Sequence, residues 1–335
     1  MRGNHERLVS IDEVHRARER IGPYVRRTPI MTSETLDRLL HAKLFFKCEN
    51  FQRTGAFKAR GALNAVWSLE PNRAVGGVVT SSSGNQAAAL SWAASLRGIP
   101  AYVAMPKCAI KSKVSAVRRY GGQIIWVESR DEVPTTEEYE RAVTRIQSNT
   151  GAELVHAYDD ERTIAGQGSC ALEILEAVAN LDAILVPVGG GGLVSGVALV
   201  AKAKRPELRV VGCEPEMADD AYQSFHTRKA IACANPRTIA DGLRASVSGL
   251  TFAHLLNHVD EIVTVSEGAI IQAMRLAWEV LKIVIEPSSA VPIAALLEKK
   301  VLGEDKRIAV VLSGGNADLT CLPWNEPCEN MGVPR

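Results

Sequence analysis

Short apolar runs alternate with longer helix-compatible segments along most of this chain. Eight short runs have the composition of β-strands, and each is followed by a helical pattern: KLFF, GGVVT, AYVAM, QIIWV, AILVPV, RVVGC, EIVTV and RIAVVLS. Such alternation predicts parallel sheets in an α/β fold. Several runs are continuously apolar, as expected where helices cover both faces of a sheet.

The order of these runs predicts two lobes. The strands between Val78 and Val127 form one compact group, and the strands after Ala183 form another. We expect a small domain over residues 78–152 and a large domain over residues 1–77 and 153–335. Near the start of the chain, Ser10 is followed three residues later by Glu13, which is the capping box of a first helix.

Composition limits the classes of partner. The 335 residues include 39 Lys and Arg against 38 Asp and Glu, so no single-sign field favours nucleic acid or an anionic membrane surface. No apolar run is long enough for a membrane span or a secretory signal, and we therefore expect a cytoplasmic protein. The seven cysteines are scattered without a C-x-x-C pair, which argues against a disulfide framework or a zinc knuckle. His254 and His258 lack the glutamate of a zincin motif and are interpreted as ordinary helix residues.

Four consecutive glycines stand in VPVGGGGLVSG, where an apolar run that ends at Val188 meets a helical pattern. Unpaired N–H groups at a helix start, with no Cβ atoms in the way, favour the binding of phosphate oxygens at Gly189–Gly192. A tight turn alone and a dinucleotide site with Glu214 on the ribose are the alternatives. The dinucleotide spacing fails, because Ser195 stands where the third glycine belongs. A cofactor monophosphate such as that of pyridoxal phosphate remains.

Lys58 lies in the first turn of a helix predicted to follow Thr54 and Gly55 in ENFQRTGAFKARGALNAVWSL. A helix N-terminus disfavours a cation and should lower the lysine pKa, as an amine nucleophile or general base requires. The apolar neighbours Phe57 and Ala59 argue against a solvated surface lysine, although Arg60 and its neighbours, which are typical of a surface, leave that alternative open.

A second anion-binding turn is predicted in VVTSSSGNQAAALSWAA. A strand ends at Thr80, and Ser81–Asn85 precede an alanine-rich helix. One serine would suffice as a plain N-cap, whereas three serines with Gly-Asn offer several donors to an anion. A substrate carboxylate fits this turn.

With these three segments, the chain resembles the serine racemase and serine/threonine dehydratase family of fold-type II pyridoxal-phosphate enzymes, the serine racemases being the closer members. The resemblance runs from about Thr28 to about Leu319 and also includes TPIMTSETLD, TIAGQGSCALEIL, EPEMADDAYQS, TIADGLRAS, IEPSSAV and VVLSGGNADL. It implies a two-lobed fold similar to that of the tryptophan synthase β subunit, with parallel-rich twisted sheets flanked by helices.

The resemblance also implies the roles of individual residues around the cofactor. Lys58 forms the internal aldimine, Phe57 packs beside the ring, Asn85 binds the phenolic oxygen, Gly189, Gly190, Gly191 and Gly192 hold the phosphate, Glu286 lies near the ring and Ser313 faces the pyridine nitrogen. A hydroxyl at that nitrogen leaves it unprotonated, which suits β-elimination.

The substrate and metal sites follow from the same resemblance. The substrate carboxylate is expected to bind Ser82, Ser83, Gly84, Asn85 and Gln86, and a divalent cation (magnesium, calcium or manganese) to bind Glu214, the Ala218 carbonyl and Asp220. From the residues alone, this acidic patch is typical of a solvated face. Two features depart from the family: Gln86 replaces the usual histidine, and Tyr158 in HAYDDERT resembles dehydratases at least as much as animal racemases.

The resemblance implies an enzyme that interconverts L- and D-serine and also eliminates water from serine or threonine to give a 2-oxo acid and ammonia. Lys58 would remove the α-proton, and Ser83 is either the second acid on the opposite face or a carboxylate ligand only. The alternatives are a threonine/serine dehydratase or threo-3-hydroxyaspartate ammonia-lyase without racemase activity, an NAD-linked dehydrogenase, and a non-catalytic amino-acid sensor. The resemblance also suggests a homodimer.

Overall fold

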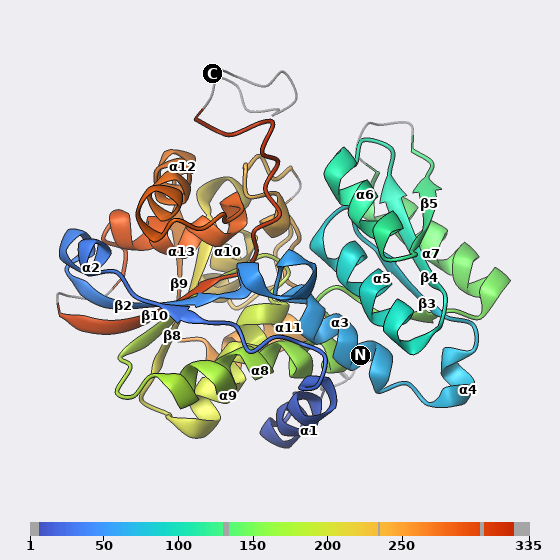
Figure 1. The fold of residues 1–335 in the computed structure, drawn as a ribbon, viewed down its shortest axis with the longest axis horizontal. Coiled ribbons are helices and arrows are strands. Elements are labelled where there is room, and N and C mark those ends of the chain that lie inside the picture. Colours follow the sequence, from blue (N-terminus) through green and yellow to red (C-terminus); the bar gives the residue numbers. More distant parts are fainter. Residues whose placement is uncertain (1–6, 130–133, 234, 302–304, 325–335) are drawn as a thin grey trace.

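Two sheets of mainly parallel strands lie in separate lobes (Figure 1). The computed structural model describes residues 7–129, 134–233, 235–301 and 305–324. In the larger lobe six strands have the order β1-β2-β10-β7-β8-β9; β1 is antiparallel to β2, and the other neighbours are parallel. Their bounds are β1 Ile30–Met31, β2 Ala42–Cys48, β7 Ala183–Pro187, β8 Arg209–Pro215, β9 Glu261–Val265 and β10 Lys306–Leu312.

Helices cover both faces of the large sheet, and Figure 1 shows α8 and α9 on one side of it and α12 and α13 on the other. The first face has a core of apolar side chains from α1 (Ile11–Ile21), α8 (Glu161–Ala177), α9 (Gly192–Lys204), α10 (Asp220–Thr227) and α11 (Gly249–His258). The second face has a core from α2 (Glu34–Leu40), α12 (Glu267–Leu276), the π-helical turn η5 (Ala277–Leu281) and α13 (Pro287–Leu297). Because both faces are covered, β7 is buried along its whole length.

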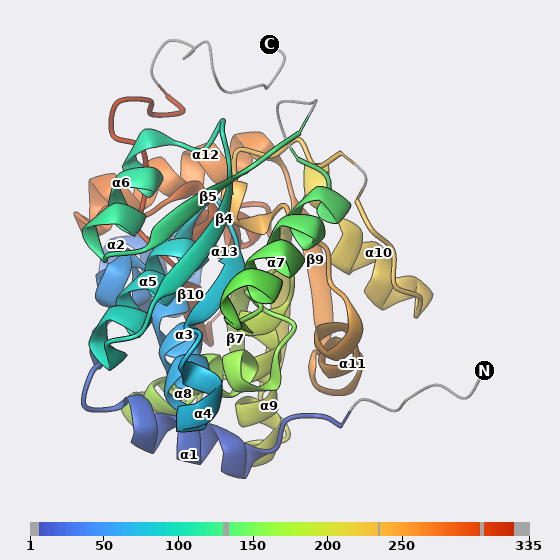
Figure 2. The same cartoon turned by 90° about the vertical axis from the view of Figure 1, so that its right-hand side faces the viewer.

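The smaller lobe contains a parallel sheet of order β5-β4-β3-β6. Figure 2 shows α5 and α6 on one side of this sheet and α7 on the other. Val78 packs into a core with α3 and α5, whereas its neighbour Val79 packs into a separate core with α7, as the alternation of a strand requires. The bounds are β3 Val78–Ser81, β4 Ala101–Pro106, β5 Gln123–Val127, β6 Glu153–Leu154, α3 Lys58–Trp67, α4 Pro71–Ala74, α5 Asn85–Arg97, α6 Lys111–Arg119 and α7 Thr136–Thr150.

The predicted α/β fold is confirmed, and all eight predicted runs form strands. The two-residue strands β1 and β6 were not predicted, because a strand of that length shows no periodicity in the sequence. The division into domains at residues 78 and 152 stays a prediction; β6 pairs with β3 and so lies just beyond the range expected for the small domain.

The ends and side chains of several elements bear on other sequence expectations. The capping box of α1 is confirmed, since Ser10 N donates to Glu13 Oε2 at 2.8 Å and Glu13 N donates to the Ser10 hydroxyl.

Cys321 is disulfide-bonded, which the scattered cysteine pattern did not predict. Within the described ranges, no helix is both long and apolar enough to cross a bilayer. His254 lies in α11, and its Nε2 accepts a hydrogen bond from Val9 N.

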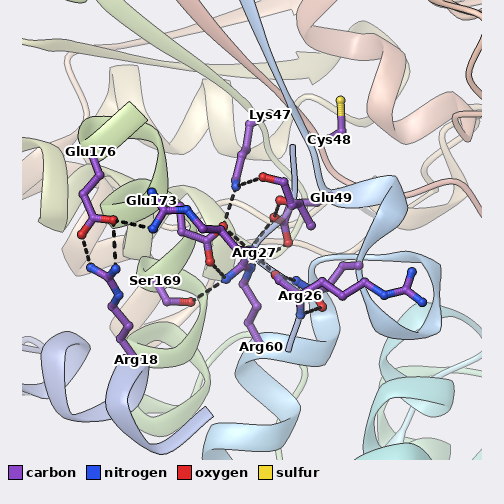
Figure 3. Close-up of polar contacts among 12 residues, drawn as sticks. Arg18, Arg26, Arg27, Lys47, Cys48, Glu49, Arg60, Ser169, Glu173 and Glu176 are labelled. Carbon is purple, nitrogen blue, oxygen red and sulfur yellow. Dashed lines mark hydrogen bonds and ion pairs between the residues drawn. The ribbon is translucent and has the colours of Figure 1, made fainter. Parts of the chain in front are cut away.

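Helix α3 packs against α5 of the smaller lobe and α8 of the larger one, and a fully buried ion cluster fixes its first turn (Figure 3). Arg60 donates two hydrogen bonds to Glu49 (2.7 and 2.8 Å) and two to Glu173 (2.7 and 2.9 Å). Lys47 adds a second cation on Glu173, so the cluster balances two positive against two negative charges. Although burial opposes ionisation, the Arg60 guanidinium keeps the pKa of Glu49 below its usual value.

Removing the Arg60 guanidinium is expected to destabilise the fold strongly. In an Arg60→Met variant Lys47 is the one cation of the cluster left for the two buried carboxylates. Loss of one partner from a buried ion pair lowers the free energy of unfolding by about 3–5 kcal/mol. Urea unfolding followed by circular dichroism measures this change. Arg73→Met is the matched control, because Arg73 forms an exposed pair with Glu153 and should change stability by less than about 1 kcal/mol. Equal losses of stability in the two variants would contradict the stabilising role of the buried ion cluster.

Candidate active site

The site is built from segments that follow the carboxyl ends of parallel strands. The turn after β7 contains the four glycines, the turn after β3 contains the Ser-Ser-Gly-Asn segment, and Ser313 follows β10 directly. Carboxyl ends of parallel strands meet at one edge of a sheet, which is where open α/β sheets bind ligands. The fold therefore assembles side chains that lie far apart in the sequence.

Lys58 is the first residue of α3, as predicted. The chain enters this helix through Thr54 and Gly55, both with positive φ, and Phe57 N donates to Ser313 O at 2.9 Å. Lys58 Nζ donates to the Ala157 carbonyl at 2.6 Å and lies 5.1 Å from the centre of the Phe57 ring. Burial lowers the pKa of Lys58 to about 8, the direction expected from the sequence, so a larger fraction of this amine is unprotonated near neutral pH than of an ordinary lysine.

Gly189–Gly192 lie in a buried turn at the start of α9. A Cβ atom on Gly190 would stand 2.4 Å from Tyr158 Cδ1, and Gly191 has φ +87°, so larger residues would not fit here. In the part of the chain that the structure describes, the N–H groups of residues 189–191 have no hydrogen-bond acceptor. Buried amides without a partner at a helix start are suited to an anion, and these residues fit a phosphate group.

A segment that the sequence analysis did not assign joins Lys58 to this turn. Ala157 supplies the carbonyl that accepts from Lys58, and the adjacent Tyr158 ring packs on Gly190. Asp159 Oδ1 then accepts from Thr251 N at 3.0 Å, which fixes the segment to the start of α11. In the sequence, Tyr158 was noted only for its resemblance to dehydratases. No local pattern in HAYDD indicated these contacts.

Ser313 and Ser289 form a pair of hydroxyls at the end of β10. Their Oγ atoms lie 3.1 Å apart, and Ser289 Oγ donates to Gly314 O and accepts from Gly314 N, both at 2.6 Å. Ser289 thus orients Ser313 and was missed from the sequence. A neutral hydroxyl at this position is the group expected to face the cofactor ring nitrogen.

Asn85 is held between two side chains of the larger lobe. Its Nδ2 donates to Glu286 Oε1 at 2.8 Å, and its Oδ1 accepts from Asn316 Nδ2 at 2.7 Å. The second hydrogen on Nδ2 remains available for an oxygen of a ligand. Burial, with the nearby Asp241 carboxylate, raises the pKa of Glu286 to about 7. Asn316, which also donates to Thr54 O, was not among the predicted residues.

The predicted carboxylate-binding turn shows unused hydrogen-bonding groups. Gly84 N donates to Ser82 Oγ at 3.1 Å, while Ser83 is exposed and has no hydrogen-bond partner among the described residues. Gln86 is 2% exposed, and neither its Nε2 nor its Oε1 has a partner within the described chain. A buried amide without partners at the start of α5 is suited to an added anion. These residues fit an amino-acid carboxylate.

The predicted metal ligands lie together at the end of β8. Glu214 accepts from Ala221 N and Tyr222 N, and Asp220 Oδ2 accepts from Val247 N at 3.1 Å. Both carboxylates are buried, so the solvated face favoured by the residues alone is wrong here. Ala218 lies between them in the short helix η3 (Glu216–Ala218).

The chemistry of these two carboxylates fits a divalent cation. Asp220 Oδ1 is buried without a partner among the described residues, and burial raises the pKa of Asp220 to about 6 and that of Glu214 well above its usual value. Among the residues described, no group of three His, Cys, Asp or Glu side chains could hold a metal. A divalent cation at Glu214 and Asp220 would therefore need further oxygen ligands, such as the predicted Ala218 carbonyl.

Comparisons with known proteins agree with this geometry. The model of the pyridoxal-phosphate dependent enzyme family matches residues 21–314. The chain is 50% identical to a beta-hydroxyaspartate dehydratase of Paracoccus denitrificans (strain Pd 1222), over 95% of this chain and 99% of the relative. It is 48% identical to a serine racemase of Arabidopsis thaliana, over 97% and 98% of the two chains. The structure of maize serine racemase superposes with a TM-score of 0.90 at 46% identity, covering 94% of this chain and 95% of the maize chain. Since these matches span nearly the whole sequence, the chain belongs to the family of pyridoxal-phosphate dependent enzymes.

Proposed function

We propose that this protein is a pyridoxal-phosphate-dependent amino-acid racemase and ammonia-lyase whose main substrate is serine. It interconverts L- and D-serine, and it eliminates water from serine or threonine to give a 2-oxo acid and ammonia. The observation that carries the proposal is the amine of Lys58, which is buried at the start of α3 and bonded to a carbonyl rather than to a carboxylate. Relatives named for serine racemisation and for dehydration support the two activities.

The cofactor, when bound, supplies an electron sink that acidifies the α-hydrogen of an amino acid. Lys58 would hold it covalently, Gly189–Gly192 would take its phosphate and Ser313 would face its ring nitrogen. The neutral Ser313 hydroxyl leaves that nitrogen without a proton. A weaker electron sink favours loss of a β-hydroxyl over competing reactions, which suits elimination.

The turn from Ser82 to Gln86 would bind the substrate carboxylate and so orient the α-hydrogen. The Lys58 amine would take that proton, and the β-hydroxyl would leave with a proton as water. Hydrolysis of the resulting enamine would consume a water and release the 2-oxo acid and ammonia. Racemisation needs a second group on the opposite face to return a proton. Ser83, whose hydroxyl has no partner among the described residues, is assigned that role.

A divalent cation (magnesium, calcium or manganese) is assigned to Glu214, the Ala218 carbonyl and Asp220. The support is the pair of buried carboxylates with an unpartnered oxygen. The dinucleotide alternative would place Glu214 on a ribose, but its glycine spacing fails because Ser195 stands where the third glycine belongs. The family resemblance favours a homodimer, and a cytoplasmic location stays a prediction from the sequence.

A second candidate function is a 3-hydroxyaspartate ammonia-lyase without racemase activity. The observation in its favour is the 50% identity to the beta-hydroxyaspartate dehydratase, slightly above that to the Arabidopsis serine racemase. The two candidates share every residue assigned above and differ in the role of Ser83, which is a second acid in the first and a carboxylate ligand only in the second, so an assay of stereochemistry separates them.

The cofactor-loaded protein is expected to convert L-serine into both pyruvate and D-serine, measured by a keto-acid assay and chiral chromatography. Lys58→Ala is expected to abolish both products because it removes the amine. Lys43→Ala, at an exposed position of β2, is the control and should leave both rates unchanged. Pyruvate without D-serine would favour the second candidate, and neither product would contradict the proposed function.

Replacing Ser83 by alanine tests its assignment as the second acid. Racemisation of L-serine is expected to fall by about 100-fold or more, the usual contribution of a positioned acid, while elimination falls much less. Ser95→Ala serves as control, since Ser95 lies near the far end of α5, the helix that follows Ser83, and bonds to Trp92 O. Parallel loss of both activities would mean that Ser83 only binds the carboxylate.

Magnesium is expected to stabilise the protein through Glu214. At a concentration 100 times its Kd, a bound cation adds about 2.7 kcal/mol to the free energy of unfolding, visible as a raised Tm. Glu214→Gln should abolish the rise, whereas Glu216→Gln, at an exposed neighbouring position, should preserve it. A magnesium-dependent rise that survives Glu214→Gln would place the cation elsewhere.

A further inference from the structure

An ion pair beside the active site joins the two lobes. Lys113, in the first turn of α6, contacts Asp241 in the short helix η4 (Asp241–Leu243) of the larger lobe. The two side chains are 11% and 29% exposed. Although burial opposes the charge, the Asp241 carboxylate raises the pKa of Lys113 above its ordinary value, so the amine stays protonated.

Asp241 is held in place by the cofactor site itself. Helix η4 packs on the glycine turn, since a Cβ atom on Gly189 would lie 2.9 Å from Leu243 Cα. Gly242 N donates to Ser288 Oγ of α13 at 3.0 Å. The carboxylate of Asp241 therefore has a fixed position next to the residues that would take the phosphate.

Lys113 reaches the turn that would bind the substrate carboxylate. A Cβ atom built on Gly84 would lie 3.6 Å from Lys113 Nζ, and the ammonium is also attracted by the Glu286 carboxylate. The exposed Arg244 opposes this charge from the larger lobe, where it donates to Thr238 O. Because burial lowers the pKa of Lys58 to about 8, Lys113 is the more fully charged of these two lysines.

We propose that Lys113 determines substrate specificity by binding the second carboxylate of a 3-hydroxy dicarboxylic amino acid, 3-hydroxyaspartate being the simplest, and that Asp241 competes for it. The inference rests on the proposed function and names a substrate class for the same site. A serine side chain adds no charge, so the ion pair persists when serine binds. A β-carboxylate needs a cation in a largely desolvated site, and Lys113 is the cation beside the substrate turn.

The exchange of partners is compatible with the surroundings of both groups. Lys113 has a flexible four-carbon stem, and its ammonium donates up to three hydrogen bonds in directions that it can adjust. Asp241 is exposed enough for water to solvate its carboxylate once the lysine turns away. One relative of this chain is named beta-hydroxyaspartate dehydratase, that is, after a substrate of this class.

Equilibrium binding of two isosteric ligands tests the inference. L-Aspartate and L-asparagine differ in one negative charge, and neither has a β-hydroxyl to lose. Calorimetry on the cofactor-loaded protein is expected to give about a 10- to 100-fold weaker affinity for L-aspartate in Lys113→Met, the usual effect of losing a charged hydrogen bond. The loss for L-asparagine should be several-fold smaller. Asp241→Asn is expected to strengthen L-aspartate binding.

Two further variants and one kinetic measurement complete the test. Lys111→Met, at an exposed position on the same helix, should behave as wild type, and Lys113→Arg should recover part of the L-aspartate affinity. The ratio of kcat/KM for 3-hydroxyaspartate to that for L-serine should fall in Lys113→Met, mainly through KM. Equal losses for both substrates would assign Lys113 to lobe packing or to the α-carboxylate and overturn the inference.

The wild-type protein separates failure of this inference from failure of the proposed function. Turnover of L-serine with no turnover of 3-hydroxyaspartate and no binding of L-aspartate overturns the role of Lys113 and leaves the proposed function intact. Turnover of no hydroxy amino acid overturns the proposed function itself.

Discussion

The carboxyl ends of parallel strands determine where every anion-binding group of this protein lies. Three strands, β3, β7 and β10, end at the turns that contain Ser82–Gln86, Gly189–Gly192 and Ser313. In two of these turns a helix begins at once, so unpaired amides face the same region from both lobes. Backbone amides bind phosphate and carboxylate without a neighbouring arginine. The site can therefore hold two anions while its one nucleophilic amine stays free of carboxylates.

Lys58 and Arg60 show how two cations on one helix acquire opposite properties. Arg60 has two carboxylates as partners and remains charged in a fully buried cluster, which anchors α3 to β2 and α8. Lys58, two residues earlier, has a single carbonyl as its partner, and burial then lowers its pKa. Because Glu49 and Glu173 are committed to Arg60 and Lys47, they do not stabilise the protonated form of Lys58. The ion cluster thus leaves the Lys58 amine, the proposed catalytic group, without a carboxylate partner.

Local sequence patterns predicted the features that depend on backbone geometry, namely the eight strands, the position of Lys58 in the first turn of α3 and the glycine turn before α9. They did not predict contacts between distant segments. Arg60 had the sequence context of a surface residue, and only tertiary pairing explains its burial. The Lys113–Asp241 pair joins residues 128 positions apart, and Ser289 and Asn316 act through partners that are 24 and 231 positions away. The metal ligands are a proposal that came from the resemblance, since an acidic segment by itself favours solvent.

The contacts between the lobes at the site are polar, and this affects how the protein can respond to a substrate. Asn85 bonds to Glu286 and Asn316, and Lys113 pairs with Asp241, so each contact joins a small-lobe residue to a large-lobe residue. The turn proposed for the substrate, Ser82–Gln86, belongs to the smaller lobe, and the turn proposed for the phosphate, Gly189–Gly192, belongs to the larger one. A ligand that replaces one of these polar partners changes the contacts that hold the lobes at this distance, whereas a large apolar interface would resist such a change. Selection between substrates and positioning of the lobes therefore depend on the same few side chains.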